Sequence, residues 1–306
     1  MRVALPIIVL GKIATIGRAS VMINVQRKLV EDMRLRGFSE LTEKTYSKAV
    51  KCYLDFLGRY PRKDRASADI RRYSMALRKR GLSYSTINTY LSAIMFMYEV
   101  VLDNPVNRKQ APLPKRRKKL PYVPPPEDVA ALMSAAPNPR ARALISLGAG
   151  SGLRISKAVA VKVDDVDSRE MRLFVEDGKG GKDRYTILSQ TSLDCLREYW
   201  VLYRPRNPQG WLFPSGKGPN HISEETCRAM LREAVRASGI GGARNVTFHT
   251  LRHYFGTRLV ESGVELHKVK ELLGHSSIST TMVYVHLANT TGGVTSPIDM
   301  LPGEMG

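Results

Sequence analysis

Cysteine and tryptophan are scarce in this sequence of 306 residues, which has three of the former and two of the latter. The cysteines, Cys52, Cys195 and Cys227, are too widely spaced for a paired metal-ligand motif or a dense disulfide framework. A small disulfide-stapled protein is therefore excluded, and a reducing cytoplasm is expected. Long hydrophobic runs are also missing, because the one membrane-like stretch, Val3 to Leu10, is interrupted by Pro6 and is far shorter than the ~20 residues that span a bilayer.

Residues 1–21 are expected to be a loosely attached leader, or the result of a start codon assigned too early, with Met22 as a plausible true beginning. A signal peptide is not favoured, because no clear small-residue cleavage site follows the apolar run between Ala14 and Ser20.

Acidic residues are few relative to basic ones. The 28 Asp and Glu against 48 Lys and Arg leave a formal charge of +20. The chain is nevertheless not expected to be disordered, because 43% of its residues are hydrophobic and can form a core. The length predicts two domains. So large a positive surplus indicates a polyanionic partner, nucleic acid in preference to an acidic membrane face.

The positive charge is concentrated in the N-terminal part, with 26 basic and 9 acidic residues up to Pro126 against 22 and 19 in the remainder. Residues 104–126 contain seven prolines and predict an extended linker. Two interpretations of its basic cluster stay open, a solvated tether or a strap that binds DNA phosphates. The cluster consists of Lys115, Arg116, Arg117, Lys118 and Lys119.

Residues 22–103 predict a bundle of four helices that forms a DNA-binding domain. Apolar residues recur at three- and four-residue intervals between Thr42, a possible cap, and Gly58, and again after Gly81, where Ser83 or Ser85 can cap. Shorter helices are expected at Ile23–Arg36 and Ala68–Arg80. Three tyrosines at core spacing, Tyr46, Tyr90 and Tyr98, are interpreted as buried, with base stacking as the alternative. The densest basic patch, a candidate phosphate contact, is Arg71, Arg72, Arg78, Lys79 and Arg80.

Residues 127–288 predict helices around a β-hairpin, followed by a tail at residues 289–306. Period-two alternation at Met171–Val175 and Arg184–Leu188 flanks a glycine-rich turn, residues 177–182. The helices are expected at Thr191–Leu202, Glu224–Ala237, Phe248–Ser262 and Glu265–Leu273. The predicted fold class is mainly α with a small β-hairpin or sheet (α+β).

His249 and Arg252 project from one face near the start of a predicted helix, where the helix dipole favours an anion. A zinc site built with His253 is not favoured, because Thr250 stands where a zincin helix has glutamate. Taken alone, Tyr284 is most simply a core residue and His275 a capping residue.

Five motifs in register change this interpretation. They are Gly152-Leu153-Arg154-Ile155-Ser156, Gly178-Lys179-Gly180-Gly181-Lys182, His249-Thr250-Leu251-Arg252-His253, Leu272-Leu273-Gly274-His275 and Tyr284-Val285-His286. Their order and spacing resemble the tyrosine recombinase, or phage integrase, family across the whole C-terminal part. The helical N-terminal part is similar to that family's core-binding domain by architecture more than by motif.

The resemblance implies a site-specific DNA recombinase that breaks and rejoins strands through a 3′-phosphotyrosyl bond, with no metal, ATP or other cofactor. By position, Arg154 and Arg252 match the arginines that hold the scissile phosphate, and Tyr284 matches the nucleophile. Lys179 matches the lysine that protonates the leaving 5′ oxygen, with Lys182 as its competitor. His249 and His275 match residues that assist proton transfer and brace the phosphate.

One position departs from the family pattern. The residue three beyond Arg154 is usually acidic, and here it is Lys157. Either the enzyme is impaired, leaving a DNA-binding relative without efficient catalysis, or a neighbour such as Asp164 or Asp165 supplies the acid. A type IB topoisomerase, which shares the chemistry, is a further alternative. The expected partners are double-stranded DNA and further copies of the chain, a dimer on one site and a tetramer in synapsis. The expected setting is a mobile genetic element, with the protein cytoplasmic and associated with the nucleoid.

Overall fold

The computed structural model describes residues 18–58, 61–107, 109, 120–178, 182–216, 218–240 and 246–288. The chain divides into two compact units, residues 1–118 and 119–306. The predicted leader up to residue 17, the linker cluster Lys115–Lys119, the hairpin residue Lys179 and the tail 289–306 lie outside the described residues.

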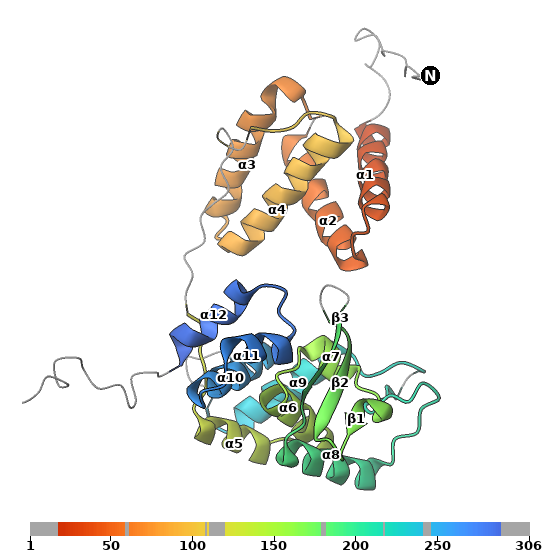
Figure 1. Cartoon of the computed structure of the whole chain (residues 1–306). Helices are drawn as coiled ribbons and strands as arrows, with labels where there is room; N and C mark the ends of the chain where they lie inside the picture. The colour runs from red at the N-terminus through yellow and green to blue at the C-terminus, as the bar shows by residue number, and fades with distance from the viewer. Residues whose placement is uncertain are drawn as a thin grey trace, which may run out of the picture. The chain divides into compact units, whose positions relative to one another are not determined.

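The described part of the N-terminal unit is a helical bundle (Figure 1). Its helices are α1 (Arg18–Leu35), α2 (Glu40–Leu57), α3 (Ala66–Lys79) and α4 (Tyr84–Phe96), with a 3₁₀ turn at Lys63–Arg65 before α3 and a π-helical segment at Met97–Val101 after α4. The predicted number of helices is confirmed. Helix α1 begins at Arg18, earlier than the predicted Ile23, so the helix extends into the expected leader.

Short polar side chains set the starts of these helices. Ser39, and not the predicted Thr42, caps α2, because its hydroxyl accepts a hydrogen bond from the Thr42 N–H. Ser83 caps α4 in the same way. Gly58 ends α2 at φ +59°, as predicted, in a conformation that suits glycine.

The core of this unit buries the apolar stripe of each helix. Leu29, Tyr53, Leu77 and Leu91 are fully or almost fully buried, and Tyr98 joins them with its hydroxyl 3.0 Å from that of Tyr53. The predicted burial of Tyr98 is confirmed, whereas Tyr46 and Tyr90 are half-buried and pack against the core. These tyrosines therefore hold the bundle together.

The C-terminal unit arranges helices around one buried helix and a small sheet. In chain order the helices are α5 (Pro126–Ser134), α6 (Pro139–Gly150), α7 (Ile155–Val159), α8 (Gln190–Tyr203), α9 (Glu224–Ala237), α10 (Phe248–Glu261), α11 (Leu266–Leu273) and α12 (Ile278–Leu287). Helix α6 is buried along Ala143–Ala149 and packs against α5, α7, α8, α9 and α10. None of the described helices of the chain combines the length and apolar character that a membrane crossing requires.

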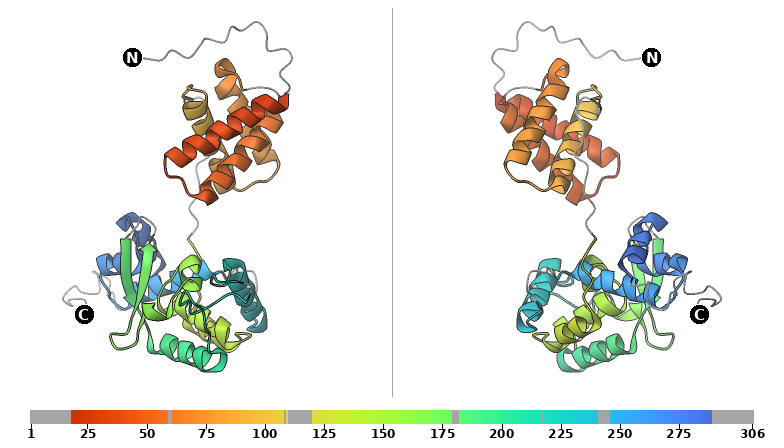
Figure 2. Two further views of the ribbon diagram at one scale, coloured as in Figure 1. Left: turned by 90° about the vertical axis from the view of Figure 1, so that its right-hand side faces the viewer. Right: turned by 90° about the vertical axis from the view of Figure 1, so that its left-hand side faces the viewer.

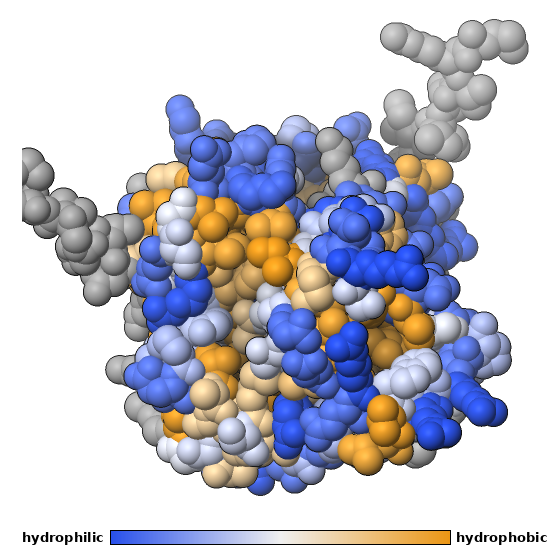
Figure 3. Space-filling model, turned by 60° about the horizontal axis from the view of Figure 1, so that its bottom comes forward, coloured by the Kyte–Doolittle hydropathy of each residue, from blue (hydrophilic) through white to orange (hydrophobic). Residues whose placement is uncertain are grey.

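The sheet is antiparallel in the order β1 (Val166–Asp167), β2 (Arg172–Gly178) and β3 (Lys182–Ile187), with Leu173 opposite Thr186. The hairpin is thus confirmed, and its strands run further towards the glycine-rich turn than the alternation predicts. Strand β3 packs against α11, which brings the hairpin next to the last three helices (Figure 2). On another side of the unit, α8 exposes Trp200, Val201 and Leu202. Figure 3, which turns the lower side of Figure 1 towards the viewer, shows hydrophobic and hydrophilic residues interspersed on that surface.

Candidate active site

Helix α10 supplies one face of the site. Thr247 caps the helix by accepting from the Thr250 N–H, and the Thr250 hydroxyl accepts from the Thr247 N–H in return (3.0 Å). His249, Arg252, His253 and Gly256 follow at helical spacing and share one face. Thr250, which stands where a zincin helix has glutamate, therefore stabilises the N-terminus of α10.

Arg252 is the centre of the site and is completely buried. Its Nη1 donates to the carbonyl of Gly152 (2.5 Å), and its Nη2 donates to the carbonyl of Leu273 (2.6 Å). Burial, followed by the charge of Arg154, lowers the pKa of Arg252 to about 9, so the guanidinium stays charged at neutral pH. The backbone carbonyls fix this cation in place before any substrate arrives.

Gly152 makes the turn that leads to Arg154. Its φ is +62°, and a Cβ there would lie 2.3 Å from the ring of Phe255, so only glycine fits. Arg154 follows as the residue that precedes α7 and is half-buried, and burial lowers its pKa. The same turn thus anchors Arg252 through a carbonyl and positions Arg154.

His275 follows Gly274, which ends α11 at φ +63°. Its Nε2 lies 3.0 Å from Nη2 of Arg252, and its Nδ1 lies 2.9 Å from the hydroxyl of Thr281. Because a guanidinium can only donate, Nε2 must accept, so the proton resides on Nδ1 and is donated to Thr281. Burial, followed by the charges of Arg252 and Arg154, lowers the pKa of His275 to about 3 and keeps the ring neutral.

Tyr284 lies on α12 with 1% of its surface exposed. Its ring stacks parallel to His275, with centroids 6.1 Å apart, and lies 5.7 Å from the ring of His253. Burial raises the pKa of Tyr284, and the positive charges of Arg252 and Arg154 oppose that rise. Gly256 packs against the ring so closely that a Cβ would lie 2.7 Å from Cε1 and Cζ.

The two histidines of α10 stand beside this centre. Their rings are 4.4 Å apart in an edge-to-face arrangement. Burial lowers the pKa of His253 to about 4, and partial burial of the ring, followed by the charges of Arg252 and Arg154, lowers the pKa of His249, although the residue as a whole stays solvent-exposed. Both imidazoles are therefore neutral at pH 7.

The structure brings the side chains of Arg154, His249, Arg252, His275 and Tyr284 into one cluster. The predicted DNA contacts Arg71, Arg72, Arg78, Lys79 and Arg80 are exposed on α3 and the residue after it, in the N-terminal unit. Arg72 is partly engaged within the bundle, 3.7 Å from Asp69 and over the ring of Phe56. Among the residues that the structure describes, no group of three or more His, Cys, Asp or Glu side chains could hold a metal ion.

Sequence reasoning missed Arg184, which the structure places in this cluster. It lies on β3, and its charge acts on both Arg252 and His275. Its position in the chain, two residues after Lys182, gives no signal of this, because only the packing of β3 on α11 brings it to the site.

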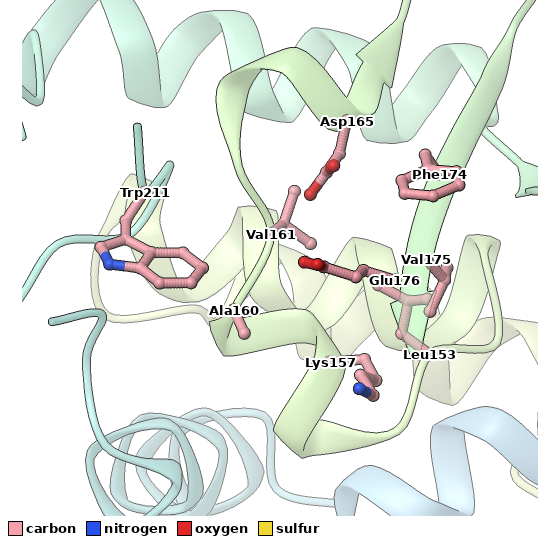
Figure 4. A pocket seen from close by; sticks show the side chains of 9 residues that line it. All are labelled: Leu153, Lys157, Ala160, Val161, Asp165, Phe174, Val175, Glu176 and Trp211. Atoms are coloured by element: carbon pink, nitrogen blue, oxygen red, sulfur yellow. The ribbon is translucent and has the colours of Figure 1, made fainter. Parts of the chain in front are cut away.

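Lys157 lies on α7 and lines a cavity of about 240 Å³, whose lining includes none of the five clustered side chains. The carboxylates of Asp165 and Glu176 also line that cavity (Figure 4). Asp165 accepts a hydrogen bond from the Lys162 N–H (2.7 Å), and burial raises its pKa. One of the two aspartates suggested as a substitute acid thus stabilises a local turn.

Comparison with known proteins gives matches along most of the chain. The model of the phage integrase family matches residues 125–291, and that of the phage integrase N-terminal SAM-like domain matches residues 26–108. A putative integrase/recombinase of Sinorhizobium fredii is 34% identical over 285 residues, covering 92% of this chain and 91% of the relative. The tyrosine recombinase XerA of Pyrococcus horikoshii is 31% identical over 217 residues, covering 71% and 74%.

A solved structure shows the same fold at low identity. A lambda integrase dimer bound to a core site superimposes with a TM-score of 0.71 at 17% identity, covering 86% of this chain and 94% of that one.

Proposed function

The chain belongs to the phage integrase family, and on that basis we propose how its residues carry out DNA recombination. The protein is a tyrosine recombinase, an enzyme that breaks and rejoins DNA strands, as the names of its relatives indicate. The observation that carries the residue assignment is the burial of Tyr284 against His275 beside two arginines, Arg154 and Arg252.

In the proposed reaction the oxygen of Tyr284 attacks the scissile phosphorus, and the bond from phosphorus to the 5′ oxygen breaks. A free phenol titrates near pH ~10, so attack at neutral pH requires cations that favour the phenolate. Arg154 and Arg252 supply those charges and hold the non-bridging oxygens. His249, neutral and solvent-accessible, is assigned to receive the phenolic proton, and Lys179, assigned from sequence alone, to protonate the 5′ oxygen.

The product is a 3′-phosphotyrosyl bond that conserves the energy of the broken linkage. A 5′ hydroxyl from another strand can attack it, which releases Tyr284 and joins the strands without ATP. Preorganised donors meet the charge that develops on the phosphate. His275 belongs to this set, because its two hydrogen bonds hold the ring in one orientation.

Double-stranded DNA is the proposed partner, in agreement with the DNA-bound structures that share this fold. Strand exchange needs two sites, so a dimer on each site and a tetramer in synapsis are proposed. Action on genomic DNA would place the protein with the nucleoid. The impaired relative and the topoisomerase are not favoured, since the relatives are named as integrases and recombinases.

The test is a suicide-substrate assay on nicked duplexes from the DNA that flanks the gene. We expect Tyr284→Phe to retain DNA affinity and to abolish the covalent adduct, because the substitution removes only the phenolic hydroxyl. Tyr254→Phe, on the neighbouring helix α10, is the matched control and should retain the adduct. An adduct that survives in Tyr284→Phe and disappears in Tyr254→Phe would reassign the nucleophile.

A further inference from the structure

Arg184 presents two guanidinium nitrogens that nothing in the described part of the chain satisfies. Its Nε donates to the carbonyl of Leu272 (2.9 Å). Nη1 and Nη2 are both buried and have no hydrogen-bond partner among the described residues. Each of these nitrogens carries two N–H donors, so four donors are withdrawn from water without compensation.

The turn before His275 is built against this side chain. A Cβ at Gly274 would lie 2.8 Å from Nη1 and 2.9 Å from Cζ and Nε of Arg184. The backbone of Gly274 therefore lies directly on the guanidinium, and Arg184 is held between β3 and the end of α11. Such a close fit fixes the direction of its free donors.

Apart from the carbonyl of Leu272, the described surroundings of Arg184 do not favour its charge. Burial, followed by the positive charge of Arg154, lowers its pKa to about 10, and no carboxylate contributes. A buried cation without an anion is costly, and such sites are normally completed by a partner of opposite charge. Arg252 differs in degree: its Nη groups make hydrogen bonds to Gly152, Leu273 and His275, which leaves the Nε donor without a partner among the described residues.

We propose that the Nη groups of Arg184 bind a non-bridging oxygen of the scissile DNA phosphate, as a third guanidinium beside Arg154 and Arg252. This rests on the proposed recombinase function and adds a catalytic residue to it. A planar fork with two free nitrogens suits a phosphate oxygen. Arg184 donates to the carbonyl of Leu272 and packs on Gly274, and Arg252 makes hydrogen bonds to Leu273 and His275 of the same turn, so both guanidiniums lie against one segment.

The first experiment measures the rate of covalent complex formation with an ordinary phosphodiester and with each methylphosphonate isomer at the cleavage position. A methylphosphonate replaces one charged oxygen by a methyl group. We expect Arg184→Ala to slow cleavage of the phosphodiester by about 100-fold, as for the loss of a transition-state donor. With the isomer that lacks the contacted oxygen, the variant and the wild type should differ by only a few-fold.

The matched control is Arg172→Ala on the adjacent strand β2, where the guanidinium is paired with Asp167 at 3.0 Å. It should cleave like the wild type. An equal loss for Arg184→Ala on all three substrates would assign Arg184 to positioning of the His275 turn and overturn the proposal, as would a rate like that of the wild type. Absence of an adduct in the wild type would instead count against the recombinase function.

A second measurement does not depend on cleavage. Inorganic phosphate is titrated at constant ionic strength, and thermal unfolding is followed. Phosphate should raise the Tm of the wild type and of Arg172→Ala, because an anion that binds only the folded state stabilises it. Arg184→Ala should show a clearly smaller rise. Equal shifts in all three proteins would overturn the proposal.

Discussion

At the scale of single residues, the site contains two glycines at which an added Cβ would overlap a neighbouring ring. Gly256 touches the ring of Tyr284, and Gly152 touches Phe255 while its carbonyl holds Arg252. Gly152 also adopts a positive φ at its turn, whereas Gly256 lies within helix α10. Each is needed because a catalytic side chain or its support occupies the space where a Cβ would lie.

Gly256→Ala tests this closeness. The added methyl group would lie 2.7 Å from the Tyr284 ring and must displace it. We expect net destabilisation, because overpacking costs about 1–3 kcal/mol and the gain in helix propensity returns at most about 1 kcal/mol. Adduct formation should fall more than DNA affinity. Gly216→Ala, where nothing lies within 4 Å, is the control in denaturant and cleavage assays. Unchanged cleavage in Gly256→Ala would show that the ring tolerates displacement.

The buried imidazoles predict a dependence of stability on pH. His275, facing Arg252, Arg154 and Arg184, has its pKa lowered to about 3, and His253, facing His249 and Arg252, to about 4. An unfolded histidine titrates near pH ~6.5. Below that pH the unfolded chain binds protons that the folded protein does not, so the stabilisation present above pH ~6.5 is lost as the pH falls towards the folded pKa values.

We expect the free energy of unfolding to decrease by about 1–2 kcal/mol per ring between pH 7.5 and 5. Urea titrations at the two pH values measure it. His275→Gln should reduce the difference, because it removes one of the two buried imidazoles. A larger difference in His275→Gln than in the wild type would contradict the sign of the pKa shift.

At the scale of elements, the sequence predicts amphipathic helices such as α9 but does not predict the buried helix α6. The segment Glu224–Ala237 was predicted with the bounds that α9 has, because its polar face contrasts with its buried Cys227, Leu231 and Ala234. Helices α5, α6 and α7 gave no specific prediction. Helix α6 is buried on nearly every side along Ala143–Ala149, so its sequence has no polar stripe to mark a helical period.

Helix α12 is connected to the end of α11 by the hydrogen bond between Thr281 and His275. We expect Thr281→Val, which retains the shape and removes the hydroxyl, to leave Nδ1–H unpaired and to cost about 1–3 kcal/mol. Cleavage should also fall, because the His275 ring loses the partner that fixes its orientation, and the loss is about tenfold for each 1.4 kcal/mol of transition-state stabilisation removed.

Thr281→Ser keeps the hydroxyl and is the matched control for both measurements. A cleavage rate of Thr281→Val equal to that of Thr281→Ser would mean that His275 does not need this partner.

At the scale of the whole molecule, the uneven distribution of charge predicts how the protein holds DNA. The N-terminal part up to Pro126 has most of the positive surplus. Arg78, Lys79 and Arg80 are exposed at the end of α3. Contacts of such residues with phosphates release counterions, and binding therefore weakens as salt rises.

Replacing Arg78, Lys79 and Arg80 by Gln should flatten the plot of log affinity against log salt for duplex DNA. Each lost phosphate contact lowers the slope by about 0.9. The control replaces Arg228 and Arg232, which are paired with Glu224 and Glu225 on α9, and should leave the slope unchanged. A parallel variant of Lys115–Lys119 tests the linker. Unchanged slopes in both variants would mean that neither the α3 residues nor the linker cluster contacts DNA phosphates.

The sequence by itself determined the family, the helical character of the N-terminal unit and five residues of the cluster, because these depend on local periodicity and on motifs whose order the chain retains. The tertiary structure decided what surrounds those residues. The carbonyls that hold Arg252, the tautomer of His275 and the burial of Tyr284 arise from segments such as Gly152 and Leu273, far apart in the chain. Arg184 enters the site only through the packing of β3 on α11, a contact that no local pattern records.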